Sequence, residues 1–343
     1  MAAVVAWCLL IGASCSSSGG THERSSSAPR QSVSGTDSQS QRPERPHHRR
    51  QSRLALVTAE LRNELVVLTI PGGHVVRRIH VAADPKTVAA APGGPVAVVS
   101  PGSGTVTLFS RELRRIGVFR SFIAPQLAAF TPDGEYVLVT DATAGTITSI
   151  ELATMRVVGR VFVGDGAHHL AISPDGSRAW VALGETATAI VIVDCNDPRH
   201  MRVLRQLHPA VAAHDVVFNP DGRTVWVSSA TAPYVSVLGA ASGRLVARVA
   251  SGRAPQHVLF ASGHAYITSG YGSSIEVVDP HMHTVIRVSR LPYGSFNLAA
   301  AGQRLVTTSV LTGAVSVLDA ATLRRLRETT VASVARSVAT LSR

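Results

Sequence analysis

The chain has 343 residues, 45% of them hydrophobic, and a formal net charge of +11. This apolar content is ample for a packed core. The charge alone would suit a nucleic-acid partner, but it is spread out: residues 1–53 hold seven Arg against three acids, and the other +7 lies on about 290 residues. Because aromatic residues make up only 5% of the chain, stacking platforms are few, and we expect no nucleic-acid binding.

Residues 1–15 are the first predicted element, a signal peptide. Residues 1–14 are apolar, have about the length of a secretory hydrophobic region, and are too short to span a bilayer. The segment ends in Gly12-Ala13-Ser14-Cys15, which resembles a bacterial lipoprotein signal, where small residues precede a cysteine that becomes lipid-modified. The resemblance implies an exported, extracytoplasmic protein anchored in the membrane through Cys15. Cleavage with free secretion and an uncleaved anchor are the alternatives.

Residues 16–52 form the second element, a linker rich in Ser, Arg and Pro with almost no aliphatic side chains. Such a composition buries too little apolar surface to offset the entropy lost on ordering. We therefore predict a disordered tether in front of a single domain at residues 53–343.

The domain is built from a repeat. A phrase of alternating apolar residues that ends in a small or polar residue occurs seven times, and its end points lie 41, 41, 43, 45, 40 and 40 residues apart. The copies lie at residues 65–69, 106–110, 147–151, 190–194, 235–239, 275–279 and 315–319. A period of this length made of short strands is typical of an architecture in which each repeat is one four-stranded sheet.

Turn residues separate the strands within a repeat. The clearest turn is Pro132-Asp133-Gly134, and the same Pro-Asp-Gly sequence returns at 174–176 and 220–222. Proline sets φ at the start of a tight turn, aspartate hydrogen-bonds nearby backbone, and glycine accepts the positive φ that a hairpin demands. The pattern predicts antiparallel strands joined in chain order.

The two ends of the domain complement each other. The strand predicted at 54–58 ends 11 residues before Thr69, the distance that separates Thr140 from Glu151, so the first repeat lacks its innermost strand. Residues 336–341 stand where that strand would follow the seventh repeat. We therefore predict an all-β, seven-bladed β-propeller with four-stranded blades, whose first blade is closed by the C-terminal strand.

Three phrases carry a family resemblance: residues 172–176 (Ile-Ser-Pro-Asp-Gly), 179–182 (Ala-Trp-Val-Ala) and 190–194 (Ile-Val-Ile-Val-Asp). They resemble the YVTN-type, YncE-like β-propeller repeat, and the resemblance covers about residues 53–343. It implies the propeller fold. Propellers of this kind include surface proteins and binding modules and, in related groups, lactonases and a streptogramin lyase.

Repeat phase also indicates where a site would lie, because one repeat position forms a ring around the central channel. The first ring is Lys86, Gln126, His168, His214, Gln256, Phe296 and Arg336, and the next position gives a second ring, Thr87, Leu127, His169, Asp215, His257, Asn297 and Ser337. Strand alternation sends the two rings in different directions. The first ring can be positive but never negative, so an anionic ligand suits it. We predict ligand contact at the mouth by Lys86, Gln126, His168, His169, His214, Asp215, Gln256, His257 and Arg336.

The histidines of these rings come from three successive repeats. His168, His169, His214 and His257 could converge on a transition metal, but contact with the ligand or structural hydrogen bonding explains them as well, so we assign no metal residue and expect no cofactor. No Cys-His pairing around Cys195 suggests a nucleophile, so it is expected to be an unreactive thiol.

Two functions fit these features. The first is a non-enzymatic binding scaffold of the cell envelope, expected to be monomeric, with an anionic small ligand or a protein partner at the channel mouth. The alternative is a lactonase- or lyase-like enzyme that uses a base, His214 or His257 beside Asp215. No complete catalytic motif is present, so no catalytic residue is assigned.

Overall fold

The computed structural model describes residues 53–342 apart from 93, 185–188, 230 and 253. The predicted signal with Cys15 and the predicted linker therefore lie outside the described residues. The chain divides into two compact units, residues 1–49 and 50–343, and all described residues belong to the second. Within them, no helix has the length and apolar character needed to cross a membrane.

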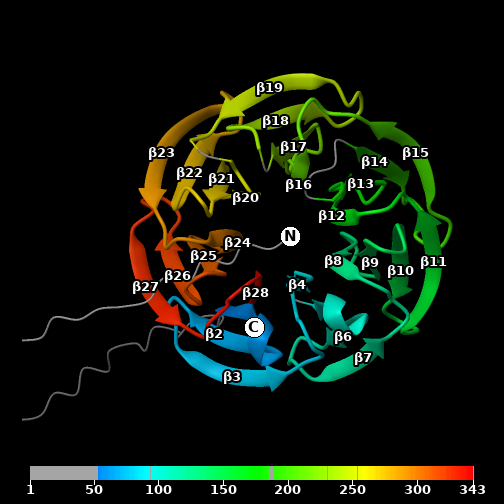
Figure 1. Cartoon of the computed structure of the whole chain (residues 1–343), viewed down its shortest axis with the longest axis horizontal. Coiled ribbons are helices and arrows are strands. Elements are labelled where there is room, and N and C mark those ends of the chain that lie inside the picture. The colour runs from blue at the N-terminus through cyan, green and yellow to red at the C-terminus, as the bar shows by residue number, and fades with distance from the viewer. Residues whose placement is uncertain (1–52, 93, 185–188, 230, 253, 343) are drawn as a thin grey trace, which may run out of the picture. The chain divides into compact units, whose positions relative to one another are not determined.

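Seven four-stranded antiparallel sheets stand in a ring around a central channel (Figure 1), which confirms the predicted fold. From the channel outward, the strands are β28 (Val338–Ser342), β1 (Arg53–Ala59), β2 (Glu64–Ile70) and β3 (Val75–His80) in blade one; β4 (Thr87–Ala90), β5 (Val96–Ser100), β6 (Thr105–Phe109) and β7 (Arg115–Phe119) in blade two; β8 (Pro125–Phe130), β9 (Tyr136–Asp141), β10 (Thr146–Glu151) and β11 (Arg156–Phe162) in blade three; β12 (Ala167–Ile172), β13 (Arg178–Leu183), β14 (Ile190–Asp194) and β15 (Arg202–Leu207) in blade four; β16 (Ala213–Phe218), β17 (Thr224–Ser229), β18 (Tyr234–Gly239) and β19 (Leu245–Ala250) in blade five; β20 (His257–Ala261), β21 (His264–Ser269), β22 (Ser274–Asp279) and β23 (Thr284–Arg290) in blade six; and β24 (Ser295–Ala301), β25 (Arg304–Ser309), β26 (Ala314–Asp319) and β27 (Arg325–Thr330) in blade seven.

The C-terminal strand closes the ring, as the sequence predicted. β28 pairs antiparallel with β1, with Arg53 opposite Ser342 and Val57 opposite Val338. It begins two residues later than expected because Arg336 and Ser337 both hydrogen-bond the backbone of one residue, Thr58. Joining the two ends of the domain in one sheet gives β1 a partner on its inner side and ties the N-terminal and C-terminal strands together.

The core lies between neighbouring blades. In blades two and three, for example, Val99 and Leu108 pack with Val137, Val139 and Ile150 in one buried cluster. In blade three, the middle strands β9 and β10 are buried on both faces. The outermost strand β11 has mostly exposed side chains, with little alternation between buried and exposed positions. Small β-branched side chains suit this packing because they fill the space between two pleated sheets in fixed rotamers.

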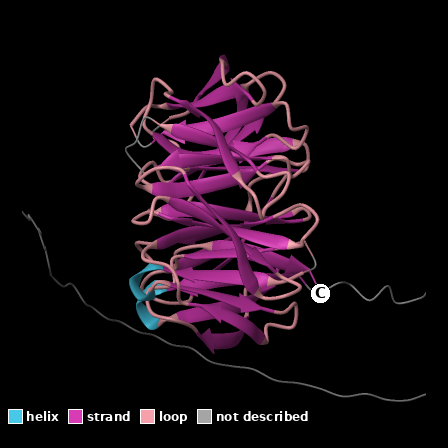
Figure 2. Ribbon diagram, turned by 90° about the vertical axis from the view of Figure 1, so that its right-hand side faces the viewer, coloured by secondary structure: helices cyan, strands magenta, loops and turns pink. Residues whose placement is uncertain are grey.

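The Pro-Asp-Gly turns form as predicted. Asp133 Oδ1 accepts the Glu135 backbone N–H at 2.9 Å, and Asp175 accepts that of Ser177 at 3.0 Å. Gly134 has a φ of 73°, where a side chain would be strained even though nothing lies within 4 Å of the site of its Cβ. The connections lie on two opposite faces, and the two single-turn helices η1 (Glu60–Arg62) and η2 (Pro101–Ser103) lie on one of them (Figure 2).

Candidate functional site

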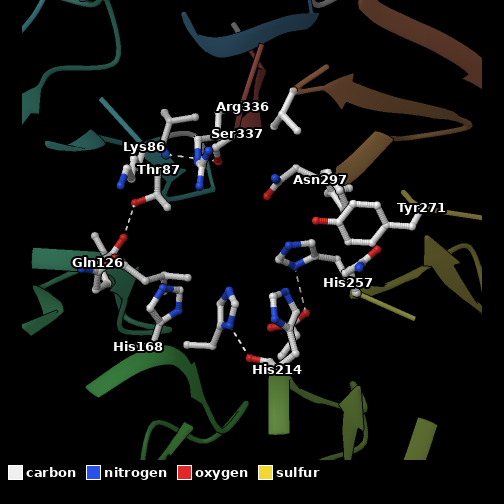
Figure 3. Close-up of a pocket in the computed structure, with 18 residues that line it drawn as sticks. Lys86, Thr87, Gln126, His168, His214, His257, Tyr271, Asn297, Arg336 and Ser337 are labelled. Atoms are coloured by element: carbon white, nitrogen blue, oxygen red, sulfur yellow. Dashed lines mark hydrogen bonds and ion pairs between the residues drawn. The ribbon is translucent and has the colours of Figure 1, made fainter. Parts of the chain in front are cut away.

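One cavity of about 600 Å³ opens where the innermost strands begin (Figure 3). Its walls contain both predicted rings in full, so every blade contributes to it. The lining residues are Lys86, Thr87, Val88, Gln126, Leu127, Ala128, His168, His169, His214, Asp215, Gln256, His257, Tyr271, Phe296, Asn297, Val310, Arg336 and Ser337. A pocket of this volume, lined mostly by polar residues, is large enough for a small organic ligand.

The two rings face the same cavity, which differs from the expected alternation. In four of the seven blades the inner strand is irregular where it begins, whereas in the other three the two ring residues lie at or just before the first residue of the strand. In blade four, Ala167 and Leu170 pair with Leu183 and Val181, so one extra residue is accommodated on β12. The same register shift occurs on β8, β16 and β24. A β-bulge of this kind re-aims side chains and bends the strand, which brings consecutive residues such as His168 and His169 to one pocket.

The carbonyl groups of the first ring hold neighbouring blades together. In five blades a hydroxyl of the second strand donates to the first-ring carbonyl of the next blade. The pairs are Thr58 to Lys86 (3.3 Å), Thr140 to His168 (2.7 Å), Ser228 to Gln256 (2.6 Å), Thr268 to Phe296, and Thr308 to Arg336 (2.6 Å).

In the other two blades a second-ring side chain takes over this bond. The second strands there carry Val99 and Ala182 at the corresponding position, and neither side chain can donate. Thr87 instead donates to the Gln126 carbonyl at 2.8 Å. His169 Nδ1 donates to the His214 carbonyl. His169 thus links blades four and five, and its Nδ1 carries the ring proton, because a carbonyl oxygen can only accept.

Four imidazole rings cluster on one side of the cavity. The ring centroid of His169 lies 4.5 Å from that of His168, 4.7 Å from His214 and 5.3 Å from His257. The His214 and His257 centroids are 5.3 Å apart. One ring nitrogen each from His169, His214 and His257 lie within 4.8 Å of one another.

Asp215 contacts this cluster through His257. Its Oδ2 lies 3.3 Å from His257 Nδ1 and accepts the Val258 backbone N–H at 3.3 Å, while Oδ1 accepts that of Val216 at 2.9 Å. Asp215 is itself buried. The only acid among the lining residues is therefore held by the backbone and oriented towards His257.

Burial keeps the inner histidines neutral. It lowers the pKa of His214 to about 3, and repulsion from a protonated His257 acts in the same direction. The pKa of His169 is held well below its usual range by burial and by the neighbouring His214, His168 and His257. Neutral imidazoles offer a lone pair for a proton, a donor or a metal ion.

The fixed positive charges lie on the other side of the cavity. Lys86 and Arg336 come from adjacent blades and lie across the pocket from His168 and His214 (Figure 3). Each has an acidic partner: Lys86 Nζ is 3.7 Å from Asp84, and Arg336 donates to Glu60 at 2.9 Å. The sequence did not reveal these pairings, which moderate the positive charge predicted for the first ring.

The two ring glutamines brace loops. Gln126 Nε2 donates to the Ala124 carbonyl at 3.2 Å, and the buried Gln256 accepts the Gly270 backbone N–H at 2.8 Å. Sequence reasoning missed Tyr271 and Val310, which reach the cavity from the β21–β22 and β25–β26 connections. The only signal was a large aromatic residue in a glycine-flanked turn.

An exposed apolar patch borders the mouth on blades six and seven. It consists of Tyr271, Tyr293 and Leu311, each more than half exposed. The Tyr271 ring lies 5.0 Å from Phe296, a lining residue, and 6.4 Å from Tyr293. We call these three residues the mouth patch. It offers a ligand or partner an apolar contact beside a polar cavity.

Cys195 lies away from the cavity and is buried. Burial raises the pKa of its thiol to about 12, with the nearby Asp194 and Asp175 carboxylates adding to the rise. A thiol that stays protonated is a poor nucleophile. The geometry gives it no chemical role.

Comparison with known proteins supports the fold. No protein-family model matches the chain, and no curated protein matches it in sequence. Among solved structures, a functionally unknown protein from Desulfotomaculum acetoxidans is similar with a TM-score of 0.74 and 12% identity over 84% of this chain and 98% of that one.

Two further structures are similar. AztD from Citrobacter koseri, in its apo form, has a TM-score of 0.67 and 9% identity, over 85% of this chain and 98% of its own. Hydrazine synthase from Kuenenia stuttgartiensis has a TM-score of 0.59 and 20% identity, over 70% and 79%. At these identities the similarity concerns architecture, so the chain is a β-propeller whose function must be argued from its own cavity.

Proposed function

We propose that the protein is a binding propeller that takes a small anionic ligand at its channel mouth. The observation that carries this proposal is a cavity that is lined by residues from all seven blades, most of them able to hydrogen-bond. Pockets at the axis of a ring of rigid sheets are largely preformed, so little ordering is needed on binding. The β-propeller fold of the structural neighbours is compatible with this role.

Arg336 is the residue best placed to recognise an anion. A guanidinium has five N–H donors, and Glu60 accepts from one of its terminal nitrogens. The remaining donors suit a carboxylate or phosphate, for which the planar fork of arginine is well matched. Lys86 adds a second cation from the adjacent blade. Asp215, the acid in the lining, has its oxygens engaged by His257 and by backbone N–H groups.

The mouth patch suggests what else the ligand carries. Tyr271, Tyr293 and Leu311 lie beside the cavity, so an anion with an apolar portion, or an acidic segment of a protein partner, would gain area there. A free inorganic anion would leave this surface unused.

Calorimetric titration with a panel of inorganic phosphate, phosphate esters and carboxylates tests the proposal. We expect at least one member with an apolar portion to bind, and Arg336→Gln to weaken it about 10-fold or more. Arg156→Gln, on the exposed outer strand β11, is the matched control and should leave affinity unchanged. Equal losses of affinity in both variants, or no binding of any member of the panel to the wild type, would contradict an anion site at the mouth.

Location is part of the same proposal. The lipoprotein-like signal supports an exported protein of the cell envelope, held at the membrane by a lipid on Cys15, and we propose that the protein acts as a monomer. Feeding cells a fatty-acid probe should label the wild type and leave Cys15→Ala unlabelled. Equal labelling of both would remove the anchor from the proposal while leaving the binding site untouched.

A second function is favoured by one contact. The Asp215 carboxylate lies 3.3 Å from His257 Nδ1, an arrangement that orients a histidine as a general base. A lactonase- or lyase-like activity would then lie at the same mouth. Incubation with lactones and cyclic depsipeptides distinguishes the two: turnover abolished in His257→Ala supports the enzyme, and an inert wild type supports the binding propeller.

A further inference from the structure

We propose that His169, His214 and His257 form a site for one transition-metal ion of the zinc or copper(II) class. The three rings come from the inner strands of successive blades, and their centroids make a nearly regular triangle with sides of 4.7, 5.3 and 5.3 Å. One nitrogen of each lies within 4.8 Å of the other two. Nitrogens sharing one tetrahedral ion are ~3.4 Å apart, so side-chain movements of about 1 Å close the site.

The orientation of two of these rings is set by second contacts. His169 donates its Nδ1–H to the His214 carbonyl, and His257 Nδ1 faces the Asp215 carboxylate at 3.3 Å. A neutral ring whose Nδ1–H is held in this way keeps the lone pair of its Nε2 for a metal ion. Metal-binding histidines commonly have their other nitrogen fixed by a backbone carbonyl or a carboxylate in this way. These contacts restrict each ring before any ion arrives.

The third ring supplies an independent observation. His214 Nδ1 is buried and has no hydrogen-bond partner among the described residues. Buried polar atoms in folded proteins nearly always have a partner. A species bound in the pocket would supply the partner that His214 Nδ1 lacks. Because His214 stands between His169 and His257 along the blade order, a ligand that satisfies it meets all three rings.

The donor set decides the class of ion. Three imidazole ligands suit zinc, copper(II), nickel and cobalt, whereas magnesium and calcium prefer oxygen ligands. Three protein ligands leave a further coordination position, which here opens into the cavity. His168 lies at the edge of the cluster, its ring against that of His169, and is not one of the three. The proposal goes beyond anion binding and does not depend on it.

A titration of the chelator-treated full-length protein with Zn²⁺, followed by calorimetry, tests the site. We expect one equivalent to bind tightly. His257→Ala should weaken binding at least about 10-fold, and Asp215→Asn, which changes only the orienting group, about 10-fold. The control is the double variant His281→Ala with His283→Ala, which removes two alternate histidines in the β22–β23 connection and should bind as the wild type does.

X-ray absorption of the zinc-loaded wild type identifies the atoms bound to zinc. Because it needs no variant, misfolding of a variant cannot affect the result. We expect a first shell of nitrogen and oxygen with the outer-shell scattering of imidazole. A shell containing sulfur, or one of oxygen alone, would overturn the proposal. So would a wild type that binds less than one equivalent, unchanged affinity in His257→Ala, or loss of binding in the His281/His283 control. If His257→Ala loses zinc binding but still binds the anion, the metal site and the anion site are independent of each other.

Discussion

Lowering the pH should destabilise the metal-free propeller through His214. The folded state holds the pKa of this residue at about 3, whereas an unfolded histidine has a pKa of about 6.5. Between these values the unfolded chain binds a proton that the folded chain does not, so the free energy of unfolding falls as the pH drops below about 6.5. Each pH unit is worth about 1.4 kcal/mol, which gives about 2 kcal/mol at pH 5 from this one group.

Urea unfolding in the presence of a chelator, at pH 7.5 and 5.0, measures the effect. Trp180 and Trp226 are fully buried and report on the packing between blades. His214→Gln cannot titrate, so its loss of stability between the two pH values should be smaller than that of the wild type by about 2 kcal/mol. His74→Gln, at an exposed position, should behave as the wild type. The reasoning is refuted if His214→Gln loses as much stability as the wild type does.

Three further predictions concern the blades. Thr140→Val removes the hydroxyl that donates to the His168 carbonyl at 2.7 Å and should lower the free energy of unfolding by about 1–3 kcal/mol, measured in urea; an unchanged midpoint would refute the role of this bond. Gly134→Ala, at a φ of 73°, should cost about 1 kcal/mol, which a shift in the thermal midpoint would show. Cys195, whose thiol pKa is raised by burial to about 12, should react with a maleimide only after unfolding; fast labelling of Cys195 itself in the native protein, located by peptide mapping, would contradict its burial.

Much of the architecture could be predicted because short segments of the sequence determine it. The turn residues at 132–134 and their later copies mark chain reversals, and a constant spacing between equivalent strands gives the number of blades. Even the closure could be read, because a strand missing at one end and an additional strand at the other fit one sheet. The ring positions followed from the same spacing, since one position per repeat occurs once per blade around the axis.

The parts of the site that escaped prediction depend on pairing and distance. The bulge that turns His169 toward the cavity is decided by how β12 registers against β13, and no residue in the sequence marks it. The pairing of Arg336 with Glu60 joins residues 276 positions apart. Tyr271 reaches the mouth through the conformation of a loop. The low pKa of His214 comes from burial that exists only once the blades have assembled.

The cavity is asymmetric, and the asymmetry links the two proposals. Blades four to six bring imidazoles to one wall, and blades one and two bring Arg336 and Lys86 to the other (Figure 3). Without an ion, only the second wall attracts an anion, and its cations share their charge with Glu60 and Asp84. A dipositive ion on the histidine wall would add an electrostatic attraction across the cavity. We therefore expect anion affinity to rise on zinc loading in the wild type and to stay constant in His257→Ala, while Arg336→Gln should weaken anion binding in both states. Equal anion affinity with and without zinc would mean that the two walls act separately.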